Sequence, residues 1–288
     1  MKTKLSLFII SAIIFILSSS NNNVNAANPN EKSEETYSWT GKYPMSFFTK
    51  TRTAKTVDKG RLFTSIKYQL FDWDLVKDSD GNYHSRTSGQ EKKRSIATLC
   101  IKYGWAKDHH IALGVPYWSN DFNLSSSNSN NSSGIANIYI FDKWNFIKET
   151  NNIPGVAVDL WYYFPNGNTD RKLGNENGAY KLTTEISKSW EYFSVHFNPG
   201  YTWSEDKDSE IGEVNAGAIF KPTKTLWPAI EYNYIDKEEL GHSQDLVPGM
   251  YWKFTKDWTF KAAAVINLDS TFTDKEDCGV LFQICHKW

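Results

Sequence analysis

The chain has 288 residues, a nearly balanced charge of 32 Lys and Arg against 33 Asp and Glu, and an aromatic content of 15%. The balanced charge gives no basis for predicting nucleic acid as a partner. The mean hydropathy of -0.53 is that of a soluble protein. A transmembrane β-barrel combines the same polarity with many aromatic residues, because only alternate residues of its strands face lipid.

The first 26 residues have the pattern of a cleaved signal peptide. Lys2 and Lys4 precede an apolar stretch at residues 5–17, and small residues close the segment at Ala26. This pattern is typical of secretion signals that are removed from the mature protein. An uncleaved membrane anchor is the alternative, but its apolar stretch would be short, because a membrane-spanning helix needs about 20 residues. We therefore predict residues 1–26 to be a signal peptide.

Residues 27–59 are rich in Asn, Glu, Lys and Thr and have no sustained periodicity. They are predicted to form a polar N-terminal arm, which is periplasmic if the following residues form an outer-membrane barrel. The aromatic residues of the arm include Trp39, Tyr43, Phe47 and Phe48. Because this part is too apolar for a free tail, we predict that residues 39–55 enter the barrel from its periplasmic end and act as a plug.

From residue 60 to residue 288 the chain repeats one unit, in which two alternating stretches are joined by a short turn and followed by a longer polar loop. Alternation predicts strands, because successive side chains of a strand point to opposite faces. Twelve strands are predicted, at residues 61–73, 93–105, 109–119, 135–144, 153–165, 179–190, 192–204, 211–221, 225–236, 245–255, 258–268 and 278–288. The predicted fold is all-β, an antiparallel transmembrane β-barrel of about 12 strands over residues 60–288.

The connections between these strands alternate in length. Long loops rich in Asn, Ser, Asp, Glu and Gly are predicted at residues 74–92, 120–134, 166–178, 205–210, 237–244 and 269–277. Most turns between them are tight. Long loops on one rim and short turns on the other are typical of barrels in the outer membrane of Gram-negative bacteria. A secreted two-sheet sandwich is the alternative, because alternation by itself does not distinguish lipid from a protein core.

Tryptophan residues gather at the short-turn ends of the predicted strands, at Trp105, Trp144, Trp190, Trp227, Trp258 and Trp288. Indole rings favour the boundary between lipid and the hydrated headgroups, although Trp227 has the opposite, lumen-facing parity. The last strand ends on Trp288 and must pair with the first strand so that no edge stays open. We expect the outer surface to contact outer-membrane lipid and lipopolysaccharide, and the last strand to engage the outer-membrane assembly machinery.

The segment GWAKDHHIALGVPYW at residues 104–118 is similar to a turn-plus-strand motif of the MetA-pathway of phenol degradation family of outer-membrane proteins. Gly60 stands before the first predicted strand, as a glycine does in that family. GIANIYIFDKW followed by IPGVAVDLWYYFPNG resembles two of the family's strands, with Asn137 where the family usually has Asp. The resemblance covers most of residues 47–288. It implies a transporter-like β-barrel channel, often encoded near pathways for aromatic or other small apolar compounds.

Strand parity selects the side chains that would line the lumen. The candidates are Lys67, Arg94, Lys102, His110, Asp159, Trp161, Tyr163, Glu185, His196, Glu213, Glu231 and Lys253. Mixed charges of this kind favour either a water-filled passage or ion pairs that brace a plugged barrel. Trp161 and Tyr163 could line a path for an apolar solute, although packing is the commoner role of such rings.

The sequence contains no constellation that predicts catalysis. A Gly-x-Ser-x-Gly stretch is absent, and the loop pair His242 and Ser243 lacks an orienting third group. His109 and His110 lack a third ligand at a recognisable metal spacing. We therefore expect no enzyme, no catalytic residue, no metal and no cofactor. The predicted function is a channel for passive movement of small molecules, and the alternative is a non-conducting structural or adhesive barrel.

Overall fold

A computed structural model describes residues 48–73, 75–77, 82–87, 90–123, 129–204, 210–237, 240–272, 274–275 and 278–288. All of them belong to one compact unit that spans residues 44–288. The predicted signal peptide and residues 27–47 of the arm lie outside the described residues. Within the described residues no helix is long and apolar enough to cross a membrane.

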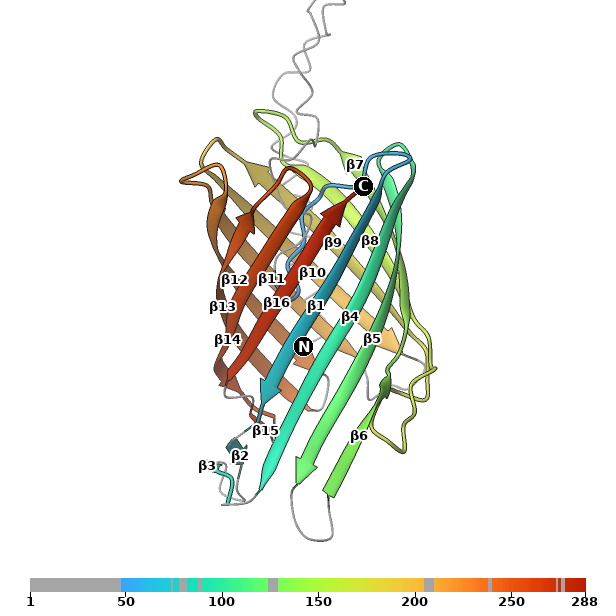
Figure 1. Cartoon of the computed structure of the whole chain (residues 1–288), viewed down its shortest axis with the longest axis vertical. Helices are drawn as coiled ribbons and strands as arrows, with labels where there is room; N and C mark the ends of the chain where they lie inside the picture. Colours follow the sequence, from blue (N-terminus) through green and yellow to red (C-terminus); the bar gives the residue numbers. More distant parts are fainter. Residues whose placement is uncertain are drawn as a thin grey trace, which may run out of the picture. The chain divides into compact units, whose positions relative to one another are not determined.

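Twelve antiparallel strands of the described residues form a closed barrel, which confirms the predicted all-β fold and strand number (Figure 1). They are β1 (Leu62–Asp72), β4 (Glu91–Ala106), β5 (His109–Asn123), the interrupted strand β6 (Ser129–Ile135) with β7 (Tyr139–Ile147), β8 (Gly155–Tyr163), β9 (Ala179–Ser189), β10 (Phe193–Ser204), β11 (Ile211–Phe220), β12 (Leu226–Lys237), β13 (Gly241–Lys253), β14 (Trp258–Ser270) and β16 (Cys278–Lys287). Strand β1 pairs with β4 on one side and with β16 on the other, so the wall has no free edge there.

One predicted strand differs from the structure. Residues 135–144 were expected to be continuous, whereas β6 and β7 pair with β5 in turn and are separated at residues 136–138. At this break, backbone N–H and C=O groups form hydrogen bonds with a side-chain amide. Asn166 accepts a hydrogen bond from the Ile138 amide at 2.8 Å and donates one to the Ala136 carbonyl at 3.2 Å. Such side-chain bonds compete with the ladder of a sheet and interrupt the strand.

The predicted loop at residues 120–134 is mostly strand, because β5 extends to Asn123 and β6 begins at Ser129. Two other predicted long loops contain short strands of their own. Strands β2 (Leu75–Lys77), β3 (Tyr83–Ser85) and β15 (Asp274–Lys275) form a small separate sheet at the lower rim in Figure 1. A fourth long loop is shorter than expected, because β13 begins at Gly241 instead of residue 245. The long connections therefore remain at one rim and the tight turns at the other.

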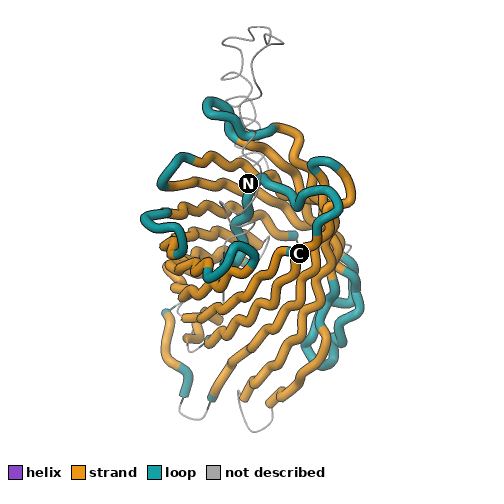
Figure 2. Tube along the Cα trace, turned by 45° about the horizontal axis from the view of Figure 1, so that its top comes forward, coloured by secondary structure: helices purple, strands orange, loops and turns teal. Residues whose placement is uncertain are grey.

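The two faces of the wall differ in chemistry as the alternation indicates. In β1 the side chains of Ile66, Tyr68 and Leu70 are exposed, whereas those of Ser65 and Gln69, which have the opposite parity, are buried. The same alternation continues around the barrel, whose wall is strand throughout between rims of loops and turns (Figure 2). An apolar exterior over a polar interior is the arrangement that a lipid environment requires.

Aromatic side chains at the short-turn rim point outward. The exposed indoles there include Trp105, Trp144, Trp190, Trp258 and Trp288. Trp227 is the exception, because its side chain is buried inside the barrel, as its parity indicated. It packs in an interior apolar cluster with Val247 and Tyr251.

The C-terminal residue completes the closure of the wall. The Trp288 amide donates to the Leu62 carbonyl at 3.0 Å, and its indole Nε1 donates to Thr64 Oγ1 at 3.2 Å. Deleting Trp288 removes these two hydrogen bonds to the β1 side of the closure, which should lower the free energy of unfolding by about 2 kcal/mol. We expect a smaller fraction of the variant to refold into detergent micelles, measured by heat-dependent gel mobility, while the conductance per folded barrel stays unchanged.

The control is Tyr192→Ala, which removes an exposed aromatic side chain from the turn between β9 and β10 without touching the closing strands. Equal losses of refolding in the two variants would mean that Trp288 acts only as one more surface aromatic residue.

Candidate functional site

A segment of the N-terminal arm runs along the inner wall of the barrel. This inner segment, residues 48–59, is bound successively by side chains of β12, β10, β9 and β5. The first contact is with Glu231, then the Arg52 amide donates to Asn198 Oδ1 at 2.5 Å and the Ala54 amide donates to Ser187 Oγ at 2.8 Å. The path ends where the Val57 amide donates to His110 Nδ1 at 3.2 Å.

Glu231 is the most heavily bonded residue along this path. Its fully buried carboxylate accepts the backbone amides of residues 48–51 at 3.0, 2.9, 2.6 and 2.7 Å. Oε1 also accepts the Thr49 hydroxyl at 2.8 Å. Successive backbone amides that converge on one anion form a nest, which compensates a buried negative charge without a cation. The carboxylate therefore fixes the start of the inner segment to β12.

Arg52 binds the inner segment to the neighbouring part of the wall. Its guanidinium lies 3.4 Å from Asp159 Oδ2 and 3.9 Å from the ring centre of Trp161. Trp161 stacks in turn on Phe141, with 4.0 Å between ring centres. A planar guanidinium can pair with a carboxylate and stack on an aromatic ring at once. Trp161, predicted as a possible solute contact, thus packs against the inner segment.

Lys143 connects the same charge cluster to the backbone of the inner segment. Its Nζ donates to the Thr53 carbonyl at 3.0 Å, lies 3.6 Å from Asp159 Oδ1 and pairs closely with Glu185. Lys143 was absent from the predicted lumen residues. Its inward parity, opposite to the exposed Trp144, is the signal that could have found it.

Glycine residues leave the space that the inner segment needs. A Cβ atom on Gly104 would lie 2.0 Å from the Asp58 carbonyl oxygen, and one on Gly249 would lie 2.5 Å from Phe48 Cζ. Gly60, which has a positive φ of 79° that favours glycine, turns the chain from the inner segment toward β1. Its amide donates to the Gly104 carbonyl at 2.6 Å. The glycine within the motif of residues 104–118 therefore serves contact with the inner segment.

The predicted lumen residues divide by burial. Eight have buried side chains: Lys102, His110, Asp159, Trp161, Glu185, His196, Glu213 and Glu231. Four are half-buried: Lys67, Arg94, Tyr163 and Lys253. The structure brings Asp159, Trp161 and Glu185 together around the inner segment, whereas Lys253 lies apart near the short-turn rim.

Two further predicted residues, Glu213 and His196, have partners on the wall itself. Glu213 pairs with Lys181 at 2.5 Å. His196 contacts Ser187 Oγ through Nδ1 at 2.8 Å and Ser194 Oγ through Nε2 at 3.0 Å. The imidazole is therefore held by hydroxyl groups. No cluster of His, Cys, Asp or Glu in the part of the chain that the structure describes could hold a metal ion.

The inner walls of the barrel differ in charge. The buried carboxylates stand on β8, β9, β11 and β12, at Asp159, Glu185, Glu213 and Glu231. Strands β1 and β4, which lie across the barrel from these, contribute Lys67, Arg94 and Lys102. Arg94 donates to Asn120 Oδ1 at 2.6 Å, and the Lys102 ammonium lies 5.6 Å from the ring centre of Phe63. The inner segment lies against the acidic wall.

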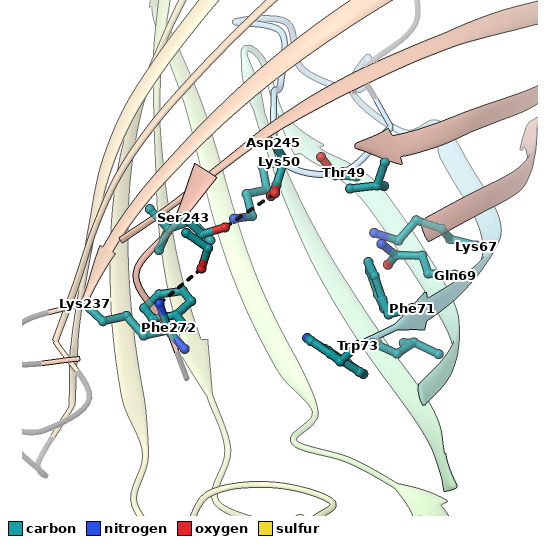
Figure 3. Close-up of a pocket in the computed structure, with 14 residues that line it drawn as sticks. Thr49, Lys50, Lys67, Gln69, Phe71, Trp73, Lys237, Ser243, Asp245 and Phe272 are labelled. Carbon is teal, nitrogen blue, oxygen red and sulfur yellow. Dashed lines mark hydrogen bonds between the residues drawn. The ribbon is translucent and has the colours of Figure 1, made fainter. Parts of the chain in front are cut away.

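A cavity of about 410 Å³ lies in the long-loop half of the barrel (Figure 3). Its lining residues are Thr49, Lys50, Lys67, Gln69, Phe71, Trp73, Ile96, Ile235, Lys237, Ser243, Asp245, Val265, Ser270 and Phe272. They come from the inner segment, β1, β4 and β12 to β14, with the connections that follow β1 and β14. Of the twelve predicted lumen residues, Lys67 alone is in this set. Sequence reasoning missed the others because the cavity depends on where Thr49 and Lys50 lie.

Two amines of the inner segment lie in surroundings that disfavour their charge. Burial lowers the pKa of the Lys50 ammonium, and Glu213 and Asp245 raise it in part. Burial also lowers the pKa of Lys55, against the effect of Glu149. An ammonium group removed from water loses hydration that only a nearby anion or acceptor can replace.

No family model and no curated protein matches the sequence. Solved structures do match. The COG4313 outer membrane channel from Pseudomonas putida F1 has a TM-score of 0.65 at 12% identity, over 82% of this chain and 98% of that chain. The NanC porin has a TM-score of 0.53 at 8% identity, over 79% and 100%, and the KdgM porin in complex with disordered oligogalacturonate has 0.50 at 10% identity, over 78% and 99%. At these identities the likeness shows the fold, which is that of outer-membrane channel barrels.

Replacing the nest-forming carboxylate should release the inner segment. In Glu231→Gln an amide nitrogen takes the place of one acceptor oxygen and faces backbone amides that also donate. Loss of two charged hydrogen bonds at a buried site should destabilise the attachment by about 3–5 kcal/mol. We expect trypsin to cleave after Lys50 and Arg52 in the folded variant, detected by mass spectrometry, while the wild-type protein resists at both bonds.

The matched control is Glu191→Gln, in the exposed turn between β9 and β10. If Glu231→Gln resists trypsin as well as this control does, the amide nest does not hold the inner segment.

Proposed function

We propose that the protein is an outer-membrane channel for passive passage of small molecules. The observation that carries this proposal is a barrel with an apolar exterior whose interior, although crossed by the inner segment, keeps a cavity of about 410 Å³. Eight-stranded barrels fill their interior with side chains, whereas barrels with more strands have room for a ligand or a passage.

The location that fits this function is the outer membrane of a Gram-negative bacterium. The predicted signal peptide, the rim asymmetry and the fold likeness to an outer membrane channel support it. Lipid and lipopolysaccharide would then cover the exterior, and the outer-membrane assembly machinery would engage the strand that ends at Trp288. Membership in the MetA-pathway of phenol degradation family is proposed on the sequence resemblance.

The solutes that suit this channel are small apolar or aromatic compounds. Phe71, Trp73 and Phe272 line the cavity, and twelve strands leave far less width than a sixteen-stranded porin. A channel is preferred to an enzyme because His110 is bonded to the inner segment and His196 to the wall hydroxyls of Ser187 and Ser194.

A non-conducting structural or adhesive barrel is the second candidate. The observation that favours it is the inner segment itself, which occupies part of the interior along residues 48–59. Conductance decides between the two. Purified protein in liposomes should give discrete single-channel currents if the interior connects the two rims, and negligible flux of every solute would leave the structural role.

Location is tested on cells that produce the full chain. The protein should sediment with membranes, need detergent for extraction and change its gel mobility on heating, because a folded barrel resists detergent until it is heated. A soluble species without such a mobility shift would contradict the outer-membrane assignment.

Removing the inner segment should widen the channel. A variant that lacks residues 27–55 loses the contacts with Glu231, Asn198 and Ser187, so the cross-section opens and single-channel conductance should rise. The matched control lacks residues 27–38 and retains the inner segment in full. Unchanged conductance in a truncated protein that still shows heat-dependent mobility would contradict a narrowing role.

A further inference from the structure

The acidic residues of the inner wall are already compensated within the protein. Asp159 on β8 pairs with Lys143 and Arg52. Glu185 on β9 also pairs with Lys143, and Glu213 on β11 pairs with Lys181. Glu231 is compensated by the amide nest. These carboxylates therefore add little net negative field to the remaining interior space.

The lysines around the cavity, in contrast, are not compensated by carboxylates. Among the described residues, Lys50, Lys67 and Lys237 have no carboxylate at ion-pair distance, and the buried Nζ of Lys50 has no hydrogen-bond partner. The cavity contains one carboxylate, that of Asp245, which accepts a hydrogen bond from Asn267 Nδ2 at 2.9 Å. A buried polar group without a partner is costly. Three amines around one carboxylate favour an anionic ligand.

The rest of the cavity wall is aromatic and aliphatic. The rings of Phe71 and Trp73 are 6.1 Å apart between centres, and the Lys237 ammonium lies 5.3 Å from the ring centre of Phe272. Ile235 and Val265 add aliphatic surface. The volume is within the range of small-molecule sites, which are about 300–1,000 Å³ with mostly apolar linings and a few polar groups.

We infer that this cavity is a binding site for a small aromatic carboxylate. The carboxylate would lie against the amine of Lys67, and the ring would lie against Phe71 and Trp73. Lys50 and Lys237 would add to the positive field of the cavity. Figure 3 shows Lys67, Phe71 and Trp73 on one side of the cavity and Lys50 beside Ser243 and Asp245 on the other. The inference rests on the proposed channel function and names its solute: a single-ring acid in preference to a neutral or cationic aromatic compound, or to an acidic sugar.

The first test is calorimetric binding to the folded full-length mature protein in detergent, with four ligands that separate charge from aromaticity. They are benzoate, benzyl alcohol, benzylamine and glucuronate. Benzoate should bind at least about tenfold more tightly than each of the others, because it alone satisfies both the amines and the rings. Equal or tighter binding of benzylamine or glucuronate would overturn the inference.

The second test removes the amines one at a time. Lys67→Gln should weaken benzoate binding about tenfold, as expected from losing a charge-assisted contact. Lys237→Gln should weaken it about threefold, because the positive field of the cavity decreases. Both variants should leave the binding of benzyl alcohol unchanged. Lys224→Gln, in the exposed turn between β11 and β12, is the control. Lys237 lies at the end of β12, so its variant keeps the test decisive if Lys67→Gln fails to fold. Wild-type affinity in a folded variant of either lysine would overturn the assignment.

Conductance of the same preparations separates this inference from the channel function. Discrete currents without selective benzoate binding would retain the channel and reject the site. Selective benzoate binding without currents would retain the site and reject passive passage.

Discussion

The carboxylate of Glu231 determines how the interior of the barrel is organised. A charge with no solvent exposure must be compensated by the protein, and here the backbone amides of residues 48–51 do so. That contact fixes the position of Lys50, which lines the cavity, and of Arg52, which pairs with Asp159. The inner segment is therefore part of the electrostatics of the wall, and its removal would expose the acidic residues that it covers.

The same arrangement separates the charges of the interior. Acidic residues on β8 to β12 face the inner segment and its associated lysines, whereas Lys67 on β1 faces the cavity. If acidic and basic side chains alternated along one wall, they would form ion pairs with each other. Because the inner segment takes up one side, the cations on the other side line the space that remains.

The sequence predicts the wall well because strand periodicity is local. Parity alone places Glu231 and Asp159 inside and Trp105 outside, and loop lengths give the rims. The prediction of one continuous strand at residues 135–144 was wrong. The break between β6 and β7 depends on Asn166, about thirty residues away in the chain, whose side-chain amide binds the backbone at Ile138. The cavity could not be predicted either, since it requires the path of a segment without periodicity.

The size of the solute follows from the same geometry. A twelve-stranded barrel has an interior wider than side chains of the wall can fill, and here the inner segment takes part of that excess along residues 48–59. Gly104 and Gly249 let it lie directly against the wall. A larger side chain at either position would push the inner segment toward the cavity. The room left for a solute is thus set by backbone contacts that the absence of two side chains permits, and it suits a single ring better than a polymer.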